Sequence, residues 1–150
     1  MRREDLFVPS LQGHSGDLPY SKLASFMVAF FGGPFAAIGF AFLNGNRTGN
    51  VDKNRLPVAL VLTVAYFAGL TWALSTEVLT LDRQMVRLLS RVVAVAVWAW
   101  LTMPLRRIYR AAELSPEDWP SPWKAGILTI IGAAVVQAFV VVVLRAGFGG

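Results

Sequence analysis

The sequence contains no cysteine, a single histidine and few charged residues. Without cysteine the chain cannot form disulfides, use a thiol nucleophile or hold a metal through thiolates. Only 15% of its 150 residues are charged, whereas a soluble domain usually carries about 25%. A surface that faces water needs those charges, and a surface that faces lipid excludes them. The shortage therefore favours a membrane protein over a soluble one.

Titratable residues are too few and too scattered for a catalytic site. The histidine, His14, lies in a polar N-terminal stretch, and none of the nine acidic residues lies within a long apolar run. Glu117 and Asp118 are adjacent, but with Ser115 and Pro116 before them they are typical of a first helical turn. No metal-ligand spacing, phosphate-binding glycine loop or nucleophile elbow occurs. We therefore predict no catalytic residue, no metal, no cofactor and no enzymatic activity.

Four apolar runs dominate the chain instead. Each has about the twenty residues that cross a hydrocarbon core of about 30 Å. We predict an all-α integral membrane bundle of four transmembrane helices. It forms one domain over residues 23–146, preceded by a polar tail over residues 1–22. The predicted spans cover about 23–43, 56–74, 85–105 and 123–145.

The first apolar run has Gly32-Gly33-Pro34 in its middle. A proline inside a helix removes a backbone hydrogen bond, and in a membrane a neighbouring helix can satisfy the freed carbonyl. The triplet therefore predicts a kink in the first transmembrane helix rather than its end. Small side chains also recur at every fourth position of this helix and would let it pack closely on a neighbour. They are Ser25, Ala29, Gly33, Ala37 and Ala41.

Three polar residues form a candidate intramembrane cluster. Gln137 is the most polar side chain deep in the fourth run, and Tyr66 and Arg91 come out at a similar depth if the termini share a side. The cluster would line a path for an ion or a small solute. Alternatively, its members join neighbouring helices, with Arg91 reaching up to the headgroups.

Basic residues between the runs form a second candidate site at one membrane surface. They would bind anionic lipid or the acidic segment of a partner, or would serve only to set the topology. These residues are Arg47, Arg106, Arg107 and Arg110. The net charge of +5 is explained in the same way, by anionic headgroups rather than by nucleic acid.

The distribution of Lys and Arg also bears on the orientation. With four spans, both termini lie on one side together with the connection over residues 75–84. The first and third loops carry a small excess of basic residues, so the positive-inside rule favours the cytoplasm for them and the outside for both termini. The excess disappears when Arg2, Arg3 and Arg91 are counted with the terminal side.

Several short elements occur in an order found in a group of known proteins. They are Phe-Gly-Gly-Pro-Phe-Ala at 31–36, Asn-Gly-Asn-Arg at 44–47, the basic end of the third run and Ser-Pro-Trp-Lys-Ala at 121–125. In these elements the chain resembles uncharacterised bacterial small four-span membrane proteins with a Gly-Gly-Pro element in the first transmembrane helix. The resemblance covers most of the chain from Tyr20 onward. It implies four helices and a bacterial inner-membrane or plasma-membrane address, and no activity.

The absence of catalytic residues favours a noncatalytic accessory subunit or scaffold. Such a protein would bind another membrane protein or a second copy of itself, in contact with the bilayer and its anionic lipids. The alternative is a small oligomeric channel or transporter, and a weaker third hypothesis is a pore-forming lysis protein or toxin.

Overall fold

The computed structural model describes residues 17–76, 82–113 and 120–148, and all regular secondary structure in these ranges is helical. The helices are α1 (Lys22–Arg47), α2 (Arg55–Ser75), α3 (Arg83–Thr102), α4 (Arg106–Glu113) and α5 (Trp123–Phe148). In this part of the chain, α1, α2, α3 and α5 are long and apolar enough to cross a membrane by length and composition. The predicted all-α class with four long apolar helices is confirmed.

Local side-chain contacts fix where the helices begin. The Ser21 hydroxyl accepts a hydrogen bond from the backbone N–H of Ala24 and caps α1. The carboxylate of Asp52 accepts from the backbone N–H of Arg55 at 2.9 Å and precedes α2. Asp82 has the same role at the start of α3. The helix start predicted at residues 115–118 lies outside the described residues, as does most of the predicted tail.

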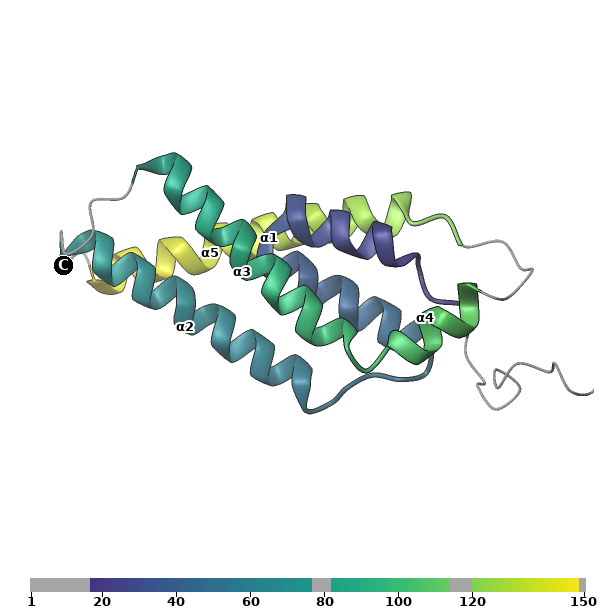
Figure 1. Ribbon diagram of the computed structural model, residues 1–150. Helices are drawn as coiled ribbons and strands as arrows, with labels where there is room; N and C mark the ends of the chain where they lie inside the picture. Colours follow the sequence, from purple (N-terminus) through teal and green to yellow (C-terminus); the bar gives the residue numbers. More distant parts are fainter. Residues whose placement is uncertain (1–16, 77–81, 114–119, 149–150) are drawn as a thin grey trace, which may run out of the picture.

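The α1 helix reverses direction at Gly33. This residue has φ 81° and ψ −171°, which is not helical, and it separates a first half (22–32) from a second half (34–47). The two ends of α1 meet, because the backbone N–H of Tyr20 donates to Asn44 Oδ1 at 2.8 Å and Arg47 Nε donates to the Leu18 carbonyl at 2.7 Å. A continuous helix would hold its ends about 37 Å apart. The segment is therefore a helical hairpin, and its two halves lie side by side (Figure 1).

The residues at the tip explain the reversal. A backbone with positive φ and extended ψ is open almost exclusively to glycine, because any Cβ would clash. Pro34 then occupies the first position of the second half, where its fixed φ suits a helix and its missing N–H costs nothing. The predicted kink is thus a helix end followed at once by a helix start.

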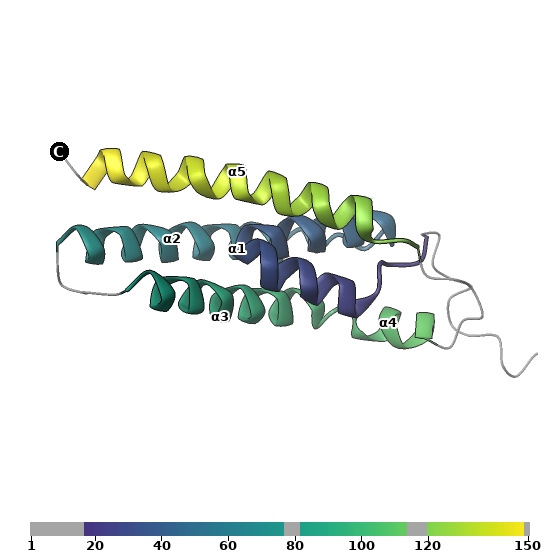
Figure 2. The ribbon, with the colours of Figure 1, turned by 90° about the horizontal axis from the view of Figure 1, so that it is seen from above.

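The hairpin changes the expected arrangement of the spans. At 1.5 Å per residue its halves are about 16 and 21 Å long, shorter than a hydrocarbon core of about 30 Å. Neither half can cross alone, which differs from the single crossing predicted over 23–43. As a result the start of α1 lies toward one end of the bundle and the end of α5 lies at the other (Figures 1 and 2). The sequence-based arrangement put both termini on one side.

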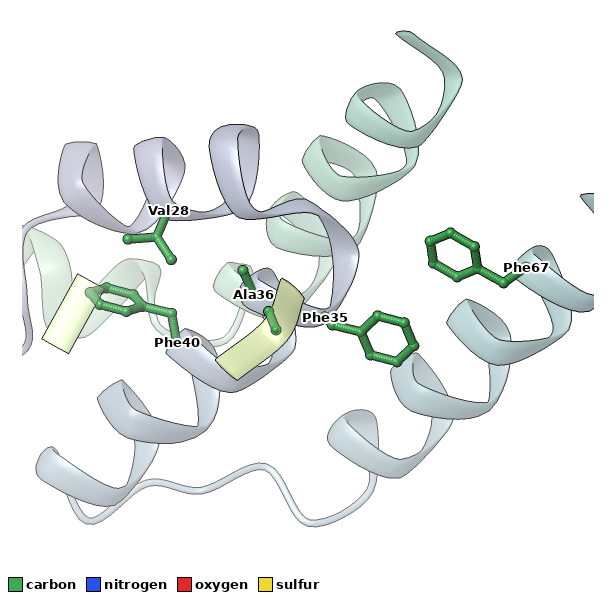
Figure 3. Close-up of a cluster of buried hydrophobic side chains, with 6 residues drawn as sticks. Val28, Phe35, Ala36, Phe40 and Phe67 are labelled. Atoms are coloured by element: carbon green, nitrogen blue, oxygen red, sulfur yellow. The ribbon is translucent and has the colours of Figure 1, made fainter. Parts of the chain in front are cut away.

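The core forms where the two hairpin halves meet each other and their neighbours. Val28 of the first half and Phe40 of the second half lie next to each other (Figure 3). Phe35, just after the tip, stacks on Phe67 of α2 with ring centroids 5.6 Å apart. The small-residue stripe is split between the halves, with Ser25, Ala29 and Ala37 buried. The remaining two members, Gly33 and Ala41, are partly exposed.

Candidate functional site

The main feature of the bundle is a cavity of about 1010 Å³ beyond the tip of the hairpin. The hairpin lies between α3 and α5 only along part of their length (Figure 2). Past its tip the cavity is lined by α2 between Phe67 and Ser75, α3 between Val86 and Arg91, and α5 between Ile130 and Arg145. Gly32 and Gly33 form the inner end of this space, which we call the tip cavity.

Three arginines line the tip cavity: Arg87 and Arg91 of α3, and Arg145 of α5. The two on α3 are four residues apart and so share one face of that helix. Among the described residues, no aspartate or glutamate lines the cavity. Within the described ranges, the charged residues that line the cavity are therefore all basic.

The inner end of the cavity is polar because the hairpin ends there. A Cβ added to Gly33 would lie 3.3 Å from Gln137 Oε1, so the Gln137 amide lies against the backbone of the tip. The last carbonyls of the first half have no partner within that half. Phe30, Phe31, Gly32 and Gly33 line the tip cavity together with Gln137.

Two further contacts position side chains of the cavity wall. The Arg91 guanidinium lies over the ring of Phe30, with Cζ 5.1 Å from the ring centroid, and this contact ties α3 to the first half of the hairpin. The hydroxyls of Ser90 and Tyr66 are 3.3 Å apart and join α3 to α2. Of the predicted polar cluster, Arg91 and Gln137 line the same cavity, and Tyr66 reaches it only through Ser90.

A network of buried hydrogen bonds closes the opposite end of the hairpin. The Asn44 side chain has no exposed surface, and its Nδ2 donates to the Tyr109 hydroxyl of α4 at 3.1 Å. Trp98 of α3 donates from Nε1 to the Ser25 hydroxyl at 3.0 Å. Burial raises the pKa of Tyr109 above its ordinary value, so the phenol stays neutral. Helices α3 and α4 thus hold the two halves of the hairpin together.

The predicted basic patch is divided by the structure. Arg47 belongs to the hairpin base, where it forms an ion pair with Asp17 at 3.6 Å and lies over the ring of Tyr20. Arg106, Arg107 and Arg110 are exposed on α4. The other face of α4 is buried through Leu105, Ile108 and Tyr109.

Sequence reasoning missed Arg87, Arg145 and Ser90 as parts of one site. The spacing of Arg87 and Arg91 was available as a signal, because residues four apart share a helix face. Arg145 looked like an ordinary helix-end charge. Only the packing of α5 beside α3 and α2 brings it to the same cavity.

Comparison with known proteins gives no further assignment: no protein-family model, no curated protein and no solved structure matches the chain.

Proposed function

We propose that the protein is a multi-pass membrane protein in which α2, α3 and α5 cross the bilayer and α1 enters and leaves it from one side. The length and apolar composition of the helices support insertion. The hydrogen bonds between residues 18–20 and 44–47 support the re-entrant path of α1. A bacterial inner-membrane or plasma-membrane address is part of the proposal.

The re-entrant path also favours one orientation. Eight basic residues lie at the end of the bundle that carries the hairpin base: Lys22, Arg47, Lys53, Arg55, Arg106, Arg107, Arg110 and Lys124. Four lie toward the other end: Arg83, Arg87, Arg91 and Arg145. The positive-inside rule then favours the cytoplasm for the hairpin base and the start of the described chain, and the outside for the end of α5.

The function that we propose is binding and passage of a polar solute or ion, as in a small channel or transporter. The observation that carries this proposal is the tip cavity. Interrupted helices at membrane depth are tolerated where their free peptide groups line a water-filled cavity, and transporter sites use them in this way. A protein that served only as a scaffold would not need the end of an interrupted helix, a glutamine and three arginines around one space.

Cysteine labelling combined with flux tests this function. Because the chain has no cysteine, Ala134→Cys on the cavity wall and Val135→Cys, 65% exposed outside it, form a matched pair. In membranes, a water-soluble maleimide should label Ala134→Cys and spare Val135→Cys. Purified protein in liposomes should then conduct or exchange ions. Equal labelling of the two sites together with an absence of flux would contradict the proposal.

An accessory subunit or scaffold is the second candidate. The apolar side chains of Phe139 and Val142 on α5 are largely exposed, and Val142 borders the tip cavity. A helix from another protein or from a second copy could pack there. If liposomes show no flux and Phe139→Cys forms disulfide-linked dimers in membranes, this second function replaces the first.

A further inference from the structure

We propose that the tip cavity binds a phosphate group, held by Arg87, Arg91 and Arg145 and closed at its inner end by Gln137. This inference deepens the proposed function and rests on it for the placement of the cavity in the membrane. It names the chemical class of the ligand, which the cavity alone does not.

The sign of the ligand follows from the charges around the cavity. Three arginines line it, and no aspartate or glutamate of the described residues does. The helix ends do not decide the sign, because the C-terminus of the first half and the N-terminus of the second half meet at Gly33 and their dipoles oppose each other. The arginines therefore set a positive potential. In the part of the chain that the structure describes, the charges around this site favour an anion over a cation.

The donors around the cavity favour phosphate over a simple halide. A guanidinium presents N–H groups in a planar fork that matches two oxygens of a phosphate. Arg91 comes from α3 and Arg145 from α5, so two walls of the cavity offer such forks. Ser90 adds a hydroxyl and Gln137 an amide N–H₂. An ion with several oxygens can use all of these donors, and a halide cannot use the fork geometry.

Two sources could supply this phosphate. One is inorganic phosphate from water. The other is the headgroup of an anionic phospholipid, whose acyl chains would lie against apolar wall residues such as Leu74 and Val142. The same arginines would bind either one, and the choice is a matter for experiment.

The test is ligand binding to purified protein in a neutral detergent. Tryptophan fluorescence and thermal unfolding are followed during titration with sodium phosphate, against sodium gluconate at equal ionic strength. In a second arm, nanodiscs of phosphatidylcholine are compared with nanodiscs that also contain phosphatidylglycerol. We expect saturable stabilisation of the parent in at least one arm. Stabilisation by phosphate assigns a free ion, and stabilisation by phosphatidylglycerol alone assigns a headgroup. No stabilisation in either arm overturns the inference.

Variants locate the site. Arg91→Gln and Arg145→Gln should each weaken the apparent Kd about tenfold, which is the order expected when a hydrogen-bonded charge is removed. Arg110→Gln, on the exposed face of α4 at the other end of the bundle, should leave the Kd unchanged. Equal weakening by Arg110→Gln would place the anion elsewhere and overturn the inference.

A labelling experiment covers the case in which the arginine variants do not fold. Ala138→Cys lines the cavity, and Thr76→Cys is exposed outside it. At each site we compare the reaction rates of a sulfonate-bearing methanethiosulfonate and its trimethylammonium analogue. The ratio of the anionic to the cationic rate should be higher at Ala138→Cys than at Thr76→Cys. Equal ratios at the two sites overturn the inference. Phosphate binding without flux would instead contradict the channel or transporter function and leave the anion site standing.

Discussion

The backbone N–H of Tyr20 donates a 2.8 Å hydrogen bond to the side chain of Asn44, twenty-four residues later in the chain. The same side chain donates to the Tyr109 hydroxyl of α4. One buried amide thus connects the segment before α1, the end of α1 and α4. This contact joins the two ends of the hairpin, and the tip cavity exists because the hairpin ends partway along α3 and α5.

Replacing Asn44 should destabilise the hairpin. Asn44→Ala removes the partner of the half-buried Tyr20 N–H and of the buried Tyr109 hydroxyl. A buried polar group left without its partner costs about 1–3 kcal/mol. We expect a lower melting temperature in detergent. Asn46→Ala is the matched control, because Asn46 lies two residues further along the same half and is exposed. Equal melting temperatures for the two variants would contradict the structural role of Asn44.

The Asn44–Tyr109 bond can be isolated with a double-mutant cycle. Tyr109→Phe keeps the ring in its buried position and removes only the hydroxyl that accepts from Asn44. The coupling free energy between Tyr109→Phe and Asn44→Ala should be about 0.5–1.5 kcal/mol, the usual value for one hydrogen bond. A coupling near zero would show that α4 does not hold the hairpin base through this contact.

Gly33 should tolerate no side chain at all. Its φ of 81° is reserved for glycine, so even Gly33→Ala should cost about 1–3 kcal/mol. Gly69→Ala on α2 is the control, because a Cβ there meets nothing within 4 Å. In a helix interior that change should be neutral or stabilising by up to about 1 kcal/mol. A Gly33→Ala variant as stable as the parent would argue for a different backbone at the tip.

The four long helices could be predicted because a long apolar run is a local property of the sequence. The reversal of the chain at residues 32–34 could not be predicted in this way. A Gly-Gly-Pro triplet permits either a kink or a stop followed by a new start, and the long-range contacts of the reversed form, such as the one between Tyr20 and Asn44, cannot be seen in the local sequence. The cavity was only partly predictable for the same reason. Arg91 and Gln137 stood out as polar residues inside apolar runs, whereas Arg145 joins them through tertiary packing.

The topology follows from the hairpin and can be tested with single cysteines. Asp17 and Lys53 are exposed at the hairpin base, and Asp82 is exposed at the other end of the bundle. We expect an impermeant maleimide to label Asp82→Cys in intact cells. Asp17→Cys and Lys53→Cys should react only after permeabilisation, because the proposed orientation puts the more basic end in the cytoplasm.

The Asp17→Cys result distinguishes a hairpin from a crossing α1. If α1 crossed the membrane once, Asp17 and Lys53 would lie on opposite sides, and one of the two would be labelled in intact cells while the other was protected. If α1 returns to the side from which it entered, Asp17→Cys and Lys53→Cys must both be labelled or both be protected in intact cells, whatever the orientation of the protein. Asp17 pairs with Arg47 at the protein surface, and exposed ion pairs contribute only about 0–1 kcal/mol. The substitution should therefore leave the hairpin intact, and a difference in labelling between Asp17→Cys and Lys53→Cys would contradict the re-entrant path.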